Sequence, residues 1–175
     1  MFRSLIIAAL LCITPLGPAL AYTLEITEAQ LQRQIENLMP LKRQQYFVTV
    51  TLSRPKIDLS VGGNRIGLST HVSASIPGVT QGTGRATITG RIRYDNQQGA
   101  FYLDRPRLEE LHIDKLPGQY QSQVRGLAQQ ALSDALSSKP VYRLNDQDLR
   151  QKLAKSMLKN VTIRHQTLLL ELDPF

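Results

Sequence analysis

Cysteine is almost missing from this sequence, and no catalytic motif takes its place. The one cysteine, Cys12, lies near the N-terminus, so residues 22–175 contain no thiol for a disulfide or for nucleophilic catalysis. No Gly-x-Ser-x-Gly motif occurs, and His71, His112 and His165 stand too far apart for a metal-site spacing. We therefore expect a protein that is not an enzyme, that uses no cofactor or metal, and that is stabilised by packing alone.

Hydrophobic runs long enough to cross a membrane are missing as well. The apolar run over residues 5–13 is too short for a comfortable span. Arg3 precedes this run and the small residues Ala19 and Ala21 follow it, a pattern typical of a cleavable signal peptide. We predict that residues 1–21 are removed and that the exported chain has no transmembrane segment.

Acidic residues are outnumbered by basic ones. The chain has 21 Lys and Arg against 14 Asp and Glu, and removal of Arg3 with the signal peptide lowers the formal net charge from +7 to +6. Such a surplus favours anionic membrane surfaces or anionic glycans as partners over nucleic acid, which an exported protein rarely meets. The alternative is a soluble protein whose basic charge serves no partner.

Four strand patterns follow one another in the middle of the chain and predict an antiparallel β-meander. Turns rich in glycine, proline and asparagine separate them, and such short connections join antiparallel neighbours. In the two inner segments apolar residues alternate with polar or basic ones, which predicts one apolar face and one basic face. The four segments are residues 47–61, 65–76, 85–94 and 100–113.

The two outer segments of the meander change phase near their middle. Apolar residues switch from one face to the other near Pro55 in the first segment and near Pro106 in the last. A bulge or a sharp bend is needed at each switch, because a slip of one residue exchanges the two faces of a strand. We therefore predict a strongly curved sheet.

A long helix is predicted to cover the apolar face of this sheet. Apolar and small residues recur at helical spacing over residues 117–138. A shorter helix follows the capping pattern of Thr27. A third helix, capped by Asn145, carries an apolar stripe that includes Leu149 and Leu153.

These elements add up to one α+β domain over residues 22–175. Residues 161–172 are expected to form a final strand, either in the centre of the sheet or beside the first strand. No linker, repeat or low-complexity segment divides the chain. The predicted architecture is a strongly curved antiparallel β-meander around a long helix, with two shorter helices.

The order of these pieces resembles the YceB-like family of bacterial envelope proteins, a domain of unknown function. The resemblance rests on residues 22–28 before a helix, the meander, the long helix, residues 139–144 and the closing residues 153–163. That family is similar to the TULIP lipid-binding proteins, in which a curved antiparallel sheet wraps a long helix and leaves an apolar tunnel. The resemblance implies a periplasmic location and a lipid or other hydrophobic ligand. Typical members are lipoproteins, whereas here Leu11 before Cys12 does not suit lipidation.

Two sets of candidate binding residues follow. The apolar set either lines a pocket for a ligand or forms a filled core. The basic set faces either anionic head groups or solvent. The rival to ligand binding is an envelope protein-interaction or structural module that has a filled core and acts through its basic face. The apolar candidates are Ile66, Leu68, Val72, Ile76, Ile88, Ile92, Val124, Leu127 and Ala131. The basic candidates are Arg65, Arg85, Arg91 and Arg93.

Overall fold

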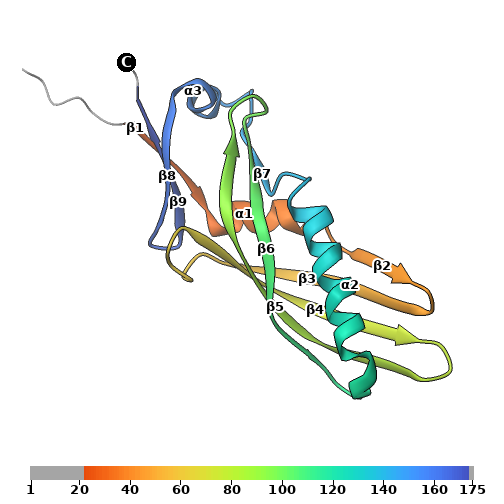
Figure 1. Ribbon diagram of the computed structural model, residues 1–175. Coiled ribbons are helices and arrows are strands. Elements are labelled where there is room, and N and C mark those ends of the chain that lie inside the picture. Colours follow the sequence, from red (N-terminus) through yellow and green to blue (C-terminus); the bar gives the residue numbers. More distant parts are fainter. Residues whose placement is uncertain (1–21, 174–175) are drawn as a thin grey trace, which may run out of the picture.

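Two antiparallel sheets and three helices make up residues 22–173, the part of the chain that the computed structural model describes (Figure 1). The α+β class is confirmed, while the predicted signal peptide lies outside the described residues. The larger sheet contains, in spatial order, β2 (Leu41–Gln45), β3 (Val48–Asp58), β4 (Arg65–Ile76), β5 (Thr80–Asp95), β6 (Ala100–Ile113) and β7 (Tyr142–Arg143). The smaller contains β1 (Tyr22–Thr27), β9 (Thr167–Leu172) and β8 (Leu158–Arg164). The helices are α1 (Glu28–Glu36), α2 (Gly118–Leu136) and α3 (Leu149–Met157).

Strands β3 to β6 form the predicted meander, in which every pair of neighbours is antiparallel. β4 and β5 pair without a register shift from Arg65 opposite Arg91 to Ile76 opposite Thr80. An additional strand that the sequence did not predict, β2, pairs with β3. Most of its residues are polar and solvated, so it lacks the alternation that identifies a strand in the sequence.

Strand β5 begins at Thr80 rather than at Arg85, because two glycines that resemble turn residues lie within the strand. A Cβ placed on Gly84 would lie 1.8 Å from the backbone oxygen of His112, and one placed on Gly82 would lie 2.4 Å from that of Asp114. β5 and β6 therefore approach each other here more closely than a residue with a side chain would allow.

The two predicted bulges are confirmed, and they are built alike. The register shifts between Ser53 and Lys56 in β3, and it shifts again where β6 passes Arg105 and Pro106. Arg54 and Arg105 adopt φ angles of 50° and 45°, and a proline follows each of them. Both bulges lie on open stretches of the sheet edge, because β2 pairs with β3 only from Val48 to Leu52 and β7 pairs with β6 only at Ala100 and Phe101.

A glutamine of α1 closes the bulge of β3. The Gln32 side chain donates a hydrogen bond to the Pro55 carbonyl at 2.7 Å and accepts one from the Ile57 amide at 2.9 Å. A bulge interrupts the ladder between strands, so its backbone groups need partners elsewhere. These two hydrogen bonds supply partners and fix α1 to the sheet.

A glutamine of α2 closes the bulge of β6 in the same way. The Gln129 side chain donates to the Pro106 carbonyl at 2.7 Å and accepts from the Leu108 amide at 2.9 Å. We call each such pair of hydrogen bonds a glutamine clasp. Each clasp joins a helix to the sheet at the point where a strand bends.

Helix α2 lies over the apolar face of the larger sheet, as predicted, and packs against β6 on one side and against β2 and β3 on the other (Figure 1). Its inward face is buried. The sheet is open, because β2 and β7 stand at opposite ends of the strand order. A sheet that wraps round the helix is therefore not confirmed. The buried residues of α2 are Val124, Leu127, Ala128, Ala131, Leu132, Ala135 and Leu136.

The C-terminal part differs from the expectation of one strand over residues 161–172. It forms a hairpin of β8 and β9, with His165 and Gln166 at positive φ angles of 49° and 57° in the turn. Two consecutive positive φ angles are typical of a tight hairpin turn, which usually contains glycine, asparagine or aspartate. Because neither residue is of that kind, the sequence carries no turn signal here.

Helix α3 also differs from its prediction. Its N-cap is Asp148, whose side chain accepts from the amides of Arg150 and Gln151, and not Asn145. Leu149 and Leu153 are 70% and 43% exposed, whereas Ala154 is buried. The predicted apolar stripe is therefore wrong, because the helix turns its alanine side inward.

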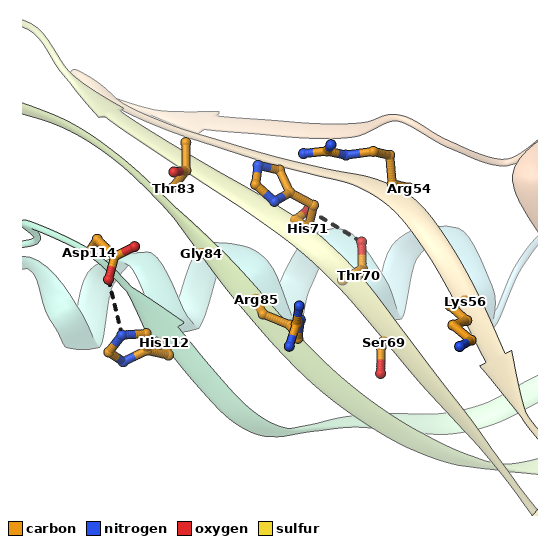
Figure 2. Close-up of a pocket in the computed structure, with 10 residues that line it drawn as sticks. All are labelled: Arg54, Lys56, Ser69, Thr70, His71, Thr83, Gly84, Arg85, His112 and Asp114. Carbon is orange, nitrogen blue, oxygen red and sulfur yellow. Dashed lines mark hydrogen bonds and ion pairs between the residues drawn. The ribbon is translucent and has the colours of Figure 1, made fainter.

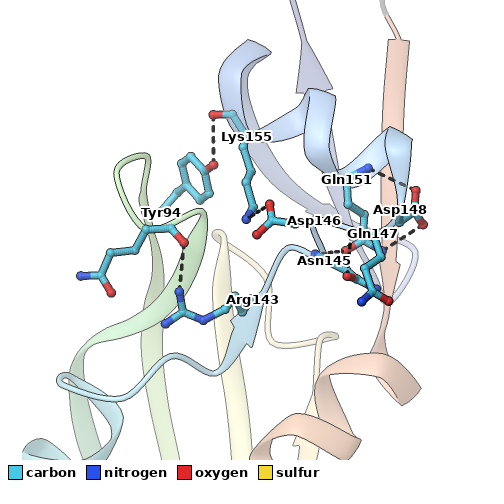
Figure 3. Close-up of polar contacts among 9 residues, drawn as sticks. Tyr94, Arg143, Asn145, Asp146, Gln147, Asp148, Gln151 and Lys155 are labelled. Atoms are coloured by element: carbon cyan, nitrogen blue, oxygen red, sulfur yellow. Dashed lines mark hydrogen bonds and ion pairs between the residues drawn. The ribbon is translucent and has the colours of Figure 1, made fainter.

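A polar junction joins the α3 segment to the β5–β6 hairpin (Figure 3). The Tyr94 hydroxyl donates to the Lys155 carbonyl at 3.3 Å, and burial raises the pKa of Tyr94. The Lys155 ammonium pairs with Asp146, and this hydrogen bond lowers the pKa of the Asp146 carboxyl. Arg143 donates to a carbonyl of the hairpin at 3.1 Å. These contacts hold the two parts of the chain together outside the core.

Replacing Gln129 by leucine should lower the free energy of unfolding by about 1–3 kcal/mol, because two backbone groups of β6 lose their partners. Gln32→Leu should have a similar effect at β3. Chemical denaturation followed by circular dichroism measures both. Gln130→Leu, on the exposed side of α2, is the matched control, and an equal loss in this variant would contradict the clasp.

Candidate functional site

The nine apolar candidates lie in one interior between α2 and the larger sheet. Eight of them are buried, and Ile92 is partly buried against them. The strands and α2 both contribute large side chains, and α2 adds the small ones of Ala128, Ala131 and Ala135. Among residues 22–173, Thr70 is the one polar residue that is buried. The interior therefore offers mainly apolar contact.

Polar and aromatic contacts hold α2 at the margins of this interior. Beside its glutamine clasp, Arg125 donates to a carbonyl of β6 at 3.0 Å. On the opposite side, Arg43 of β2 forms an exposed ion pair with Asp134 at 3.0 Å. Near the N-terminal end of α2, the Tyr120 ring packs edge-on against Phe47, with 6.5 Å between the ring centres. The apolar interior is thus closed by one helix that is attached at its edges.

The outer face of the larger sheet carries a basic cleft of about 780 Å³ (Figure 2). Four neighbouring strands, β3 to β6, contribute its side chains, and none of the nine apolar candidates is among them. His112 and Asp114 pair with each other in its wall at 3.2 Å. The ionisable side chains that line it are Arg54, Lys56, His71, Arg85, His112 and Asp114.

The four basic candidates all lie exposed on this outer face, but their surroundings differ. Arg85 lines the basic cleft. Arg65 and Arg91, which face each other across β4 and β5, line a second cavity of about 260 Å³. Arg93 lies over the Tyr102 ring, 4.7 Å from its centre. The structure therefore brings Arg65 and Arg91 together and separates both from Arg85.

The sequence analysis missed Arg54 and Lys56, which lie at the bulge of β3. Simple alternation does not continue through a bulge, so it does not tell which face either side chain occupies. One signal was present in the sequence: both bent segments contain the dipeptide Arg-Pro. Arg54 lines the basic cleft, and Arg105, the corresponding residue of β6, lines the second cavity.

Residues 22–173 contain neither a cluster of metal ligands nor a helix suited to a membrane. No three histidine, aspartate or glutamate side chains gather there as a metal ion would require. No helix in that part combines the length and the apolar character that crossing a membrane demands.

An α+β domain with a bulged antiparallel meander and a covering helix thus defines the architecture. The chain belongs to the DUF1439 family, which is described as a protein family of unknown function and whose model matches residues 26–167. The match extends from β1 to the start of β9 and so takes in elements of both sheets. Among curated proteins, none matches the chain. The similarity to YceB-like and TULIP proteins stays a prediction.

Thr70 supports the floor of the basic cleft, where its hydroxyl donates to the Ser53 carbonyl at 2.7 Å. Thr70→Val should lower the free energy of unfolding by about 1–3 kcal/mol, because the partly buried Ser53 carbonyl at the bulge loses its partner. Thermal or chemical unfolding measures this change. Thr49→Val, at a partly exposed position of β3, is the control, and a loss as large there would argue against the role of Thr70.

Proposed function

We propose that this chain is an exported, non-catalytic protein of the bacterial periplasm that binds a lipid or another hydrophobic ligand between α2 and the larger sheet. The observation that carries the proposal is that one helix, attached at its edges, closes an interior lined by apolar side chains. The buried residues of that interior include no carboxylate, histidine, lysine or arginine, which fits binding without catalysis.

Ligand entry requires α2 to move, because side chains fill the interior when the helix is in place. The backbone of α2 approaches β6, β2 and β3 more closely than it approaches β4 and β5. Large side chains such as Leu68 and Ile88 occupy the space over those central strands. On this proposal α2 and the sheet separate to form an apolar tunnel of the TULIP kind.

The free energy gained by burying an acyl chain can be compared with that of the contacts that hold α2 at its margins. An acyl chain gains about 0.8 kcal/mol for each methylene it buries, so roughly ten methylenes contribute about 8 kcal/mol. A hydrogen bond contributes about 0.5–1.5 kcal/mol, and an exposed ion pair contributes less. A long acyl chain therefore offsets the loss of the clasp and of the Arg43–Asp134 pair at the margins, provided that it replaces the apolar contacts that α2 gives up with the sheet.

A second candidate function is an envelope interaction module that keeps its core filled and binds an anionic partner on its outer face. The observation that favours it is the position of the basic cleft, which opens on the outer face and shares no residue with the apolar interior. The two candidates differ in one respect that can be measured, namely whether α2 must move.

Joining α2 to β2 should block ligand uptake if the first candidate is correct. Residues 22–175 contain no cysteine, so the double variant Arg43→Cys/Asp134→Cys can be closed by a short bis-maleimide. Closure should lower the affinity for a fluorescent fatty acid and a fluorescent phospholipid by about tenfold or more. The reason is that the cross-linked protein scarcely populates the state in which α2 has moved away from the sheet. Fluorescence titration measures the affinity before and after closure.

Lys159→Cys/Asp173→Cys, which replaces another surface ion pair, serves as the control for the chemistry. Closure of this pair in the smaller sheet should leave probe binding unchanged. Equal affinity of the open and closed Arg43→Cys/Asp134→Cys protein would rule out a moving α2. A protein that binds neither probe before closure would rule out the hydrophobic ligand and leave the outer face as the candidate site.

A further inference from the structure

Three cationic side chains line the basic cleft without an ion-pair partner among the described residues. Arg54 and Lys56 come from β3, and Arg85 comes from β5. The one carboxylate in the lining, Asp114, hydrogen-bonds to His112 at 3.2 Å and offsets at most one of the three positive charges. The cleft therefore carries an excess of positive charge that the protein does not neutralise.

The nearest acid along β3 does not neutralise this excess. Asp58 accepts hydrogen bonds from the hydroxyl and the amide of Ser60 at 2.5 Å and 2.7 Å. These two bonds, with a smaller contribution from Lys56, lower the pKa of Asp58. Its carboxylate is thus directed to Ser60 at the end of the strand, and no ion pair joins it to Lys56.

The backbone brings the cations together. The bulge holds Arg54 at a φ of 50°, a conformation that is costly for a residue with a side chain. Arg85 lies opposite His71 in β4 and opposite His112 in β6. Since neighbouring strands are roughly 4.8 Å apart, β3 and β5 are about 10 Å apart. Long side chains span that gap, and Figure 2 shows Arg54 extending toward His71.

The second cavity of the outer face provides a comparison within the same sheet. It contains the four arginines Arg65, Arg91, Arg105 and Arg107 and the two carboxylates of Asp104 and Glu109. Asp104 pairs with Arg105 at 3.2 Å. The two cavities thus keep the same formal excess of positive charge, but at about 260 Å³ the second one has only a third of the volume of the basic cleft.

We infer that the basic cleft binds the phosphate group of a phosphorylated ligand. Guanidinium groups form strong, charge-assisted hydrogen bonds with phosphate oxygens, and a lysine ammonium adds a point charge. The hydroxyls of Ser69 and Thr83 supply further donors in the lining. A cleft of about 780 Å³ exceeds a bare phosphate and leaves room for the group that carries it. The site lies on the face opposite α2 and is independent of the proposed hydrophobic ligand.

The test uses the chain of residues 22–175 and two sources of the same chemistry. Calorimetry with glycerol 3-phosphate probes a soluble phosphate ester, and co-sedimentation with phosphatidylcholine vesicles that contain phosphatidic acid probes a lipid head group. Arg54→Gln/Arg85→Gln should weaken whichever interaction is present by about tenfold or more, since two charged donors are lost. Binding to the vesicles but not to glycerol 3-phosphate would show that the phosphate belongs to a lipid head group.

Arg105→Gln/Arg107→Gln removes the same charge from the second cavity, again with one residue at a bulge, and is the matched control. It should retain most of the affinity at physiological salt. Equal losses of affinity in the two double variants would mean that general surface charge causes the binding, and would overturn the proposed site. Failure of the unmodified protein to bind either probe would also overturn it. Thermal unfolding of each variant checks that the sheet is intact.

Discussion

The glutamine clasps at the two strand bulges are the interaction on which the rest of the structure depends. Each bulge shifts a strand by one position, so that apolar residues on both sides of the bend reach the same interior. Such a bend exposes backbone groups, and Gln32 and Gln129 satisfy them with the same pair of hydrogen bonds. Because the glutamines belong to α1 and α2, the bends also determine where both helices meet the sheet.

The same bulges shape the outer face. At each one an arginine adopts a positive φ before a proline and lines a cavity on the solvent side, Arg54 in one case and Arg105 in the other. Each bulge therefore attaches a helix on the inner side of the sheet and presents a cation on the outer side. The two faces of β4 share no side chain, so an apolar ligand beneath α2 and an anion in the basic cleft would bind to separate surfaces.

Much of the fold could be predicted, and the reason is periodicity. The meander, both bulges and α2 follow from the spacing of apolar residues, which reports the local conformation of the chain. The apolar interior was predicted for the same reason, since its members face inward on β4, β5 and α2. Of the basic cleft only Arg85 was a candidate. Arg54 and Lys56 were missed because a bulge breaks the alternation that assigns a residue to a face.

The sequence by itself determined the class of fold, the segregation of apolar from basic residues and the need for two bends, because each is a property of neighbouring residues. Only the tertiary structure decided which groups close those bends. In both clasps the glutamine lies 23 positions from its proline, before it in α1 and after it in α2. The exposure of Leu149 and the pairing of β9 with β1 were decided in the same way. Such contacts join segments that are distant in the chain, and no local pattern records them.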